Sequence, residues 1–381
     1  MVVGLDVHKK ETVAFVVHGL PLESGEWFSF QTTRESILDA LPRLRGERVL
    51  IEASTSGKAV ARFLCNNKVD AVLVPADVLS AHMRRAKSDK LDARDLARIG
   101  LVGGYSTCYI PTSQEDDVRA IVRHVRDLRE QQAAFKNQIR AIAQRNLVPP
   151  PMGSLSNQGP KRRWRHLPLP HSEQLTICSK IDLLEQVEHQ EEAVMLELYR
   201  LVHADPNIRS LLGIKGIDVY TAATVTSHCG DMTRFPNPKK IASYSGLAPR
   251  LSQSGTKARH GGITKAGPNM LRHALIEATH TIVRYPGRLQ TKFKRLRARI
   301  GAGRAIVATA RTLITAIWRM LIDKKPYADI EDKLAAAKRW RLSAVVKLIE
   351  RGAIEDAVAI SRRTDVRMIQ RAWQKRITDA G

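Results

Sequence analysis

The stretch that decides the fold is Val2-Val3-Gly4-Leu5-Asp6-Val7, followed by the polar break His8-Lys9-Lys10-Glu11 and the apolar run Thr12-Val13-Ala14-Phe15-Val16-Val17. Two apolar runs around a short polar break predict the two strands of a hairpin. Asp6 stands inside the first run, where burial of an unpaired charge costs on the order of several kcal/mol. We therefore expect Asp6 to be paired or to bind a cation.

The segments after this hairpin alternate between strand and helix patterns. We expect strands at 27–31, 48–52 and 71–74, and helices at 34–43, 57–66 and 77–99. A hairpin followed by alternating strands and helices predicts an α/β domain, with a mixed sheet covered by helices, over residues 1–110.

Three further acids accompany Asp6 in this domain. Glu52 ends the apolar run Val49-Leu50-Ile51, at the carboxyl edge where sites in such sheets collect. Asp89 and Asp92 are three residues apart, which on a helix turns both to one side. Carboxylate oxygens suit Mg²⁺, and two such ions about 3.5–4 Å apart would support phosphodiester chemistry.

Each acid also has a purely structural interpretation. A strand acid can cap a loop or pair with an arginine, and two aspartates on a polar helix are usually solvated. The hairpin also resembles the phosphate loop of sugar kinases and related ATPases. A turn of His8-Lys9-Lys10 lacks the glycines that such a loop needs, which disfavours the kinase interpretation.

The middle of the chain, 111–205, is dominated by two long helix patterns. The first spans 113–145 and stops at Pro149-Pro150-Pro151, and the second spans 171–203. Their apolar spacing fits pairing with each other or across a dimer, so the pattern leaves both open. Residues 149–170, rich in Pro, Gly, Ser and Arg, predict an exposed, mobile basic linker.

The region 206–325 carries the strongest basic signal. Between Lys239 and Arg311 there are sixteen Lys or Arg residues and one acid, Glu277, as expected of a nucleic-acid face. The stretch Leu212-Gly213-Ile214-Lys215-Gly216-Ile217 has the form of a helix-hairpin-helix turn, although a simple tight turn fits as well. The residues we expect to contact nucleic acid are Lys215, Lys239, Lys240, Arg250, Lys257, Arg259, Lys265 and Arg272.

We expect two serines of this region to lie on a flexible, glycine-flanked, cationic loop. A hydroxyl beside Lys and Arg side chains is a plausible nucleophile towards phosphorus. Spacing does not choose between Ser252 and Ser254. Both serines could also merely bind phosphate or cap a turn.

The composition agrees with a nucleic-acid partner. Lys and Arg number 62 against 38 Asp and Glu, a net charge of +24 over 381 residues, beyond what solubility needs. We see no apolar run of about eighteen residues and no leader pattern, so we expect a cytoplasmic protein. The four cysteines contain no Cys-x-x-Cys pair, so we expect no zinc knuckle or disulfide framework.

Taken together, the motifs resemble a known family. The segments Gly4-Leu5-Asp6-Val7-His8-Lys9, Ile51-Glu52-Ala53, 87–93, the Gly213 turn, 235–250 and Ser254-Gly255 are similar, in this order over about residues 1–290, to transposases of the insertion-sequence one-ten (IS110) family, relatives of the Piv invertases. Ser54-Thr55 after Glu52-Ala53, and Pro268 after Lys265-Ala266, depart from the family pattern, and the tail has no counterpart.

The resemblance implies a transposase that cuts and rejoins DNA strands. It implies a RuvC-like, RNase H-type domain with an Asp-Glu-Asp-Asp site at Asp6, Glu52, Asp89 and Asp92, a coiled-coil region at 111–205, and a mostly helical transposase domain at 206–325 with its catalytic serine at Ser254. It further implies Mg²⁺, homodimers or tetramers that combine the two domains from different subunits, and a structured guide RNA encoded by the element.

Two other functions stay open from the sequence. One is a junction-resolving nuclease that uses the same carboxylates without a covalent step. The other is a catalytically silent nucleic-acid-binding protein of transposase origin, although such a protein would be free to lose the four acids and the serine, which are all present. Residues 326–381 predict only a helical extension.

Overall fold

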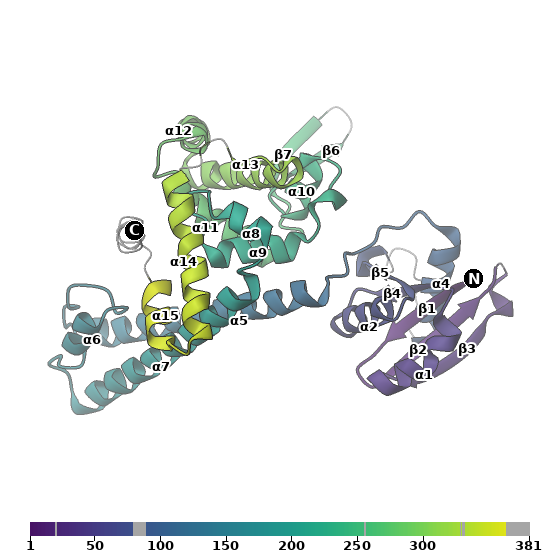
Figure 1. Ribbon diagram of the computed structural model, residues 1–381, viewed down its shortest axis with the longest axis horizontal. Helices are drawn as coiled ribbons and strands as arrows, with labels where there is room; N and C mark the ends of the chain where they lie inside the picture. The colour runs from purple at the N-terminus through teal and green to yellow at the C-terminus, as the bar shows by residue number, and fades with distance from the viewer. Residues whose placement is uncertain (20, 79–88, 255–256, 328, 330–331, 363–381) are drawn as a thin grey trace. The chain divides into compact units, whose positions relative to one another are not determined.

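The computed structural model describes residues 1–19, 21–78, 89–254, 257–327, 329 and 332–362 of the chain. The chain divides into two compact units, Met1–Gln114 and Glu115–Gly381 (Figure 1). The finer division at residues 205 and 325 stays a prediction.

The first unit is built on a five-stranded sheet with the order β3-β2-β1-β4-β5. β1 pairs antiparallel with β2 and parallel with β4, so the predicted mixed sheet is confirmed. The strands are β1 Val2–Val7, β2 Glu11–Val17, β3 Glu26–Gln31, β4 Arg48–Glu52 and β5 Asp70–Val74, with a short 3-10 turn, η1, at Leu22–Ser24.

Helices cover both faces of this sheet (Figure 1). Val3, Leu5 and Ile51 face α1 (Arg34–Leu44) and α2 (Thr55–Asn66), which begin at the side-chain caps Thr33 and Ser54. Those two helices fall within two residues of the predicted ranges. On the other face lies α4 (Asp89–Val102). Of the expected 77–99 helix, residues 77–78 and 89–99 are helical, and residues 79–88 lie outside the described residues.

The second unit contains the two long helices, α5 (Ser113–Arg145) and α7 (His171–Val202). They run side by side within one chain (Figure 1). Arg129 Nε donates to Glu191 at 2.7 Å, and Lys180 Nζ to Gln138 at 2.8 Å. The pairing left open by the sequence is therefore made inside the chain, and a coiled-coil geometry stays a prediction.

Residues 149–170 are mostly exposed, as expected of a linker, but the segment is anchored to the rest of the unit. The segment contains a short helix, α6 (Gln158–Trp164), and it buries Leu155, Lys161 and Trp164 against the long helices. Lys161 Nζ is paired with the carboxylates of Glu185 and Glu188 on α7. A few apolar anchors and the buried Lys161, paired with two carboxylates, fix a segment whose composition is otherwise that of a loop.

The remainder of this unit is mostly helical, as expected, around one large core that α9, α11, α13 and α14 share. A two-stranded ribbon, which the sequence did not predict, interrupts the helices. The elements are α8 Pro206–Leu211, α9 Val219–Cys229, the 3-10 turn η2 Met232–Arg234, α10 Pro238–Tyr244, β6 Pro249–Ser254, β7 Lys257–Ile263, α11 Asn269–Ile282, α12 Arg288–Ile300, α13 Ala302–Asp323, α14 Asp332–Glu350 and α15 Ile354–Ser361.

One helix differs from the expectation that the sequence contains no apolar run long enough to span a membrane. Among the described residues, α13 is long and apolar enough by length and composition to cross a membrane. Half of its most apolar stretch is buried inside the protein, where Leu313, Ile314 and Ile317 belong to the core. A core helix of a globular protein has the same composition. The four cysteines are free, as expected.

Candidate functional site

Asp6 and Glu52 are neighbours on adjacent strands. β1 and β4 are parallel with Leu5 opposite Ile51, so one step further along both strands brings Asp6 beside Glu52. Residues opposite each other on paired strands point to the same face of a sheet, here the face that also carries Gly4 and Leu50. Asp6 is 5% exposed, and Glu52 is half-buried. The two acids predicted on separate strands therefore meet at one edge of the sheet.

Glycines let α4 approach this face closely. A Cβ added at Gly4 would lie 2.0 Å from the Ala93 carbonyl oxygen and 2.7 Å from the Ala97 nitrogen. A Cβ at Gly100 would lie 2.5 Å from Val2. The end of α4 thus lies at the start of β1 and its middle at Gly4, so α4 runs antiparallel to β1.

This direction brings the first turn of α4 towards the acids. Asp89 precedes Ala93 by one helical turn, about 6 Å along the axis. Asp6 lies about 7 Å beyond Gly4 along β1. The backbone at the start of α4 is therefore at the level of Asp6. Asp92 is half-buried there, and the side chain of Asp89 lies outside the described residues.

His8 is a site residue that the sequence analysis missed. Its Nε2 donates to Asp6 Oδ2 at 3.0 Å, and its ring is about half exposed. Thr32 Oγ1 donates to the His8 carbonyl at 2.9 Å and holds the turn in place. The available signal was the spacing of two residues between Asp6 and His8, which places both on one side of an extended chain.

The residues at this edge fit a divalent metal ion in chemistry. Asp6, Glu52, Asp92 and Asp89 offer only carboxylate oxygens, the donors that Mg²⁺ prefers. Among the side chains that the structure describes, no group of three or more His, Cys, Asp or Glu is drawn close enough to hold a metal. Of the four acids, the two on the sheet are in register and buried or half-buried, which is the part of the site that the fold itself fixes.

Ser252 and Ser254 lie on the ribbon, and the expectation of a flexible loop around them is wrong for the backbone that the structure describes. β6 pairs with β7 with Ser252 opposite Arg259 and Ser254 opposite Lys257. Ser254 is the last residue of β6, and residues 255–256, which follow it, lie outside the described residues. Backbone pairing thus brings each candidate serine next to a basic position.

Further predicted basic residues lie on the segments that precede, form and follow this ribbon in the chain. Lys239, Lys240, Arg250 and Lys265 are exposed. Arg250 donates to the Thr264 carbonyl at 3.2 Å, and Arg272 to the Lys265 carbonyl at 3.1 Å. These contacts tie the base of the ribbon to the start of α11. The cations of this stretch are thus held on an ordered backbone.

Lys215 lies on the glycine turn between α8 and α9, with its Nζ 5.4 Å from the centre of the Tyr285 ring. The turn has a support that the sequence analysis missed. Lys338 on α14 is 8% exposed, and its Nζ donates to the carbonyls of Ile214 at 3.1 Å and Ile217 at 2.8 Å. Burial lowers the pKa of Lys338 to about 8. No local pattern reveals this contact, because more than a hundred residues separate its partners.

Two models of transposase families match the chain, one in each half. The family model for DEDD transposases of the IS110 type, described as "Transposase", matches residues 3–146. A second, the "Transposase IS116/IS110/IS902 family", matches residues 208–294. The first covers Asp6, Glu52, Asp89 and Asp92, and the second covers the glycine turn and the ribbon.

Curated relatives extend over most of the chain. The chain is 25% identical to the transposase for insertion sequence element IS1111A of Coxiella burnetii, over 86% of this chain and 91% of the relative. It is 27% identical to the putative transposase y4qE of Sinorhizobium fredii, over 84% and 81%. A pilin gene-inverting protein of Moraxella bovis is 30% identical over 38% of this chain and 45% of its own length. The chain belongs to the IS110 family of transposases, enzymes that cut and rejoin DNA.

Proposed function

We propose that the chain moves an insertion sequence by strand cleavage and exchange, with two kinds of catalytic group. Asp6, Glu52, Asp89 and Asp92 hold Mg²⁺, and Ser254 is the nucleophile. The observation that carries the metal half is the register of β1 and β4, which sets Asp6 beside Glu52 on the face covered by α4. Bound Mg²⁺ stabilises negative charge on the phosphoryl and leaving oxygens.

The covalent step balances as a transesterification. Ser254 Oγ forms a bond to the scissile phosphorus, the bridging bond to the neighbouring sugar oxygen breaks, and the hydroxyl proton is transferred to that oxygen. A sugar hydroxyl of the second strand then forms a bond to the same phosphorus, the bond from phosphorus to Ser254 Oγ breaks, and the proton of the sugar hydroxyl is transferred to Ser254 Oγ. Lys257, opposite Ser254 in the ribbon, is a basic neighbour for the phosphoryl oxygens.

The choice of Ser254 over Ser252 rests on the family resemblance, as do the partners. We propose a homo-oligomer in which the carboxylates and the serine that act on one strand come from different subunits. We further propose that a structured RNA guides the choice of target, and that the enzyme acts in the cytoplasm. The excess of 24 positive charges supports binding of more than one nucleic-acid strand.

The test is a joining assay in bacterial cells that carry the whole element on a donor plasmid, so that any RNA encoded by the element is present. The Asp6→Asn variant should lose at least about 100-fold of the joined product, because the metal contributes several kcal/mol to the transition state. Asp70→Asn is the matched control, since Asp70 lies on β5 in an exposed pair with Arg48 at 2.8 Å. Asp6→Asn at full activity would contradict the metal site.

Co-expression of two inactive variants tests the subunit arrangement. If the carboxylates and the serine come from different chains, Asp6→Asn and Ser254→Ala together should restore part of the activity that each lacks alone. No restoration would show that both sets act from one chain. A nuclease that only resolves junctions would instead retain cleavage in the Ser254→Ala variant, and a silent binding protein would show no cleavage at all.

A further inference from the structure

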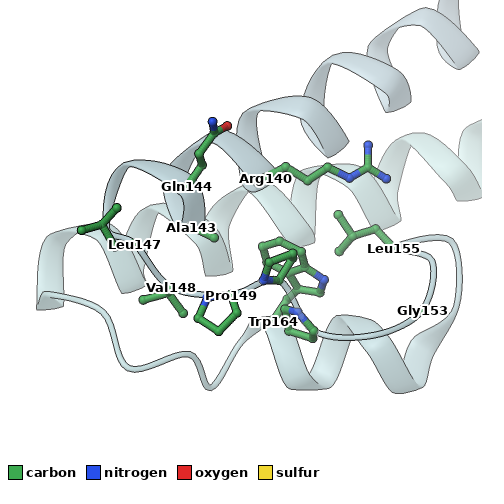
Figure 2. Close-up of a pocket in the computed structure, with 11 residues that line it drawn as sticks. Arg140, Ala143, Gln144, Leu147, Val148, Pro149, Gly153, Leu155 and Trp164 are labelled. Atoms are coloured by element: carbon green, nitrogen blue, oxygen red, sulfur yellow. The ribbon is translucent and has the colours of Figure 1, made fainter.

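A cavity of about 640 Å³ lies at the far end of the α5–α7 helix pair, away from the ribbon and the carboxylates in sequence. Figure 2 shows Arg140, Ala143 and Gln144 of α5 along the upper part of the view, Pro149 and Trp164 below them, and Leu155 and Gly153 to the right. The volume is that of a small-ligand site. No part of the proposed transposition chemistry uses it.

The walls of this cavity are fixed in place. Trp164 and Leu155 belong to a buried cluster with Ile139 of α5 and Ile177 of α7. Gly153 has φ +101°, and a Cβ there would lie 2.7 Å from Pro160. A side chain at this position would therefore be strained and would clash. The conformation of this loop beside the cavity therefore requires glycine at position 153.

Polar contacts hold the same loop from both sides. Arg163 Nη2 donates to the Met152 carbonyl at 2.7 Å, and Lys136 Nζ donates to Ser156 Oγ at 2.9 Å. Both donors belong to the helices that flank the loop. The cavity is thus a preformed feature, which lowers the entropic cost of binding a ligand.

The wall contains a polar group without a partner. Trp164 is 2% exposed, and its Nε1 has no hydrogen-bond acceptor among the residues that the structure describes. A buried N–H left unsatisfied costs about 1–3 kcal/mol, so such groups in native proteins normally meet an acceptor. An acceptor supplied by a ligand in the cavity would remove this cost.

We infer that the cavity binds one unpaired nucleobase of a DNA or RNA strand. Bases are flat, pack against apolar surfaces such as the exposed Leu147 and Pro149 that line the cavity, and carry acceptor atoms for an indole N–H. The exposed Gln144 offers the amide pair that reads base edges. The exposed cations Arg140, Arg162 and Arg163 around the segment favour a polyanion over an apolar peptide.

The apolar rim makes a second copy of the chain the main competing occupant. Leu147 is 91% exposed and Met152 is 88% exposed beside the cavity. A second copy that docked here through the same surface would bring its own exposed Arg140, Arg162 and Arg163 against these cations, which opposes association at this site. The inference rests only on the action of the chain on nucleic acid, and its test needs neither Mg²⁺ nor strand cleavage.

The test measures binding of the full chain, without Mg²⁺, to a labelled duplex that has one unpaired nucleotide and to the same duplex fully paired. Wild-type protein should prefer the unpaired nucleotide by about tenfold, the scale of satisfying one buried N–H group. DNA and RNA forms of both probes identify the source of the base. Equal affinity for the bulged and the paired probes of both kinds would overturn the inference.

Variants assign the preference to the cavity. Gln144→Ala and Arg140→Ala should each remove most of it, and Trp164→Phe should reduce it while keeping an aromatic ring. Gln131→Ala and Arg123→Ala, at exposed positions of the same helix, should retain it. A photoreactive 5-iodouracil at the unpaired position should cross-link within residues 140–164.

Two results would contradict the assignment even if the preference exists. One is a preference that persists in Gln144→Ala and Arg140→Ala, together with cross-links outside residues 140–164. The other is concentration-dependent self-association of the free protein that these variants abolish, which would assign the cavity to a second copy. Because the Gln144 and Arg140 side chains are exposed, loss of folding does not explain a change in their variants.

Discussion

Asp6 on β1 and Glu52 on β4 lie side by side, one step beyond the paired residues Leu5 and Ile51 of two parallel strands. Both strands lie in the interior of the sheet and carry side chains of the buried core. Neither acid can therefore move away from the other without disturbing the core. The two carboxylates repel one another unless a cation or a proton lies between them. Their adjacency is the physical basis of the metal site that we propose.

The close packing of α4 on Gly4 should be essential for this site. In a Gly4→Ala variant the new Cβ would lie 2.0 Å from the Ala93 carbonyl, so α4 must move outward. We expect a loss of about 1–3 kcal/mol in the free energy of unfolding, as in overpacked cores, together with loss of activity. Urea unfolding measures the change in the free energy of unfolding, and the joining assay measures the loss of activity.

Gly19→Ala is the matched control for this change, because a Cβ at Gly19 has no neighbour within 4 Å. It should change stability by less than about 0.5 kcal/mol. An equally stable and active Gly4→Ala variant would show that α4 does not pack on β1 in the way described.

Lys239 and Lys240 should contribute to DNA binding through phosphate contacts. Both are exposed at the start of α10, and Asn237 caps their backbone N–H groups. Each lysine that neutralises a phosphate adds about one unit to the slope of log K against log salt concentration. The double variant to alanine should lower the slope for duplex DNA by about two.

The adjacent pair Lys324 and Lys325 provides the control, since both are exposed but lie outside the basic stretch. Their double variant should leave the slope nearly unchanged. Equal effects of the two double variants would mean that net charge, and not a defined face, governs binding.

Lys338 should stabilise the glycine turn between α8 and α9. A Lys338→Met variant removes the donor to the carbonyls of Ile214 and Ile217 and leaves both buried without it. We expect a loss of about 1–3 kcal/mol in unfolding free energy. DNA binding should weaken as well if the turn contacts phosphate. Lys347→Met, an exposed position on the same helix, should melt like the wild type. Identical melting of the two variants would refute the supporting role.

His228 should make the protein sensitive to acid. Burial and the nearby Arg119 lower the pKa of His228 to about 4 from its ordinary 6.5, while its ring bonds to the Thr224 carbonyl. The unfolded chain binds the proton first as the pH falls, so stability decreases between pH 6.5 and 4. The difference corresponds to about 3 kcal/mol.

Denaturant unfolding as a function of pH measures this slope. A His228→Asn variant should lose it, even if its stability at neutral pH is lower. Replacement of the exposed His124 on α5 should not change it. An unaltered slope in His228→Asn would assign the acid sensitivity to other groups.

The sequence predicted what depends on local patterns. Asp6 and Glu52 stood out because each is a charge in an apolar strand, and the order of strands and helices gave the mixed sheet. The direction of α4 could not be predicted, because it depends on two contacts between distant residues. Gly4 contacts Ala93, about ninety residues away, and Gly100 of α4 contacts Val2. The His8 contact with Asp6 depends on the exact turn between two strands.

Several features of the second unit were also not predicted, because local sequence patterns do not show them. Residues 149–170 have the composition of a linker, but Leu155 and Trp164 are enough to anchor them to the long helices. The ribbon of β6 and β7 is rich in glycine and polar residues, so its strands lack the apolar alternation that marks a half-buried strand. The contact of Lys338 joins distant parts of the chain.

The most direct measurement of the central claim is a search for a DNA strand covalently linked to the protein. Purified protein is incubated with RNA transcribed from the element, labelled donor and target DNA, and Mg²⁺. The mixture is then denatured, and the labelled strands are separated by mass. Wild type and Ser252→Ala should show a linked strand, and Ser254→Ala and Asp6→Asn should not. If Ser254→Ala and Asp6→Asn both still yield recombinant product, the carboxylate and serine account is wrong.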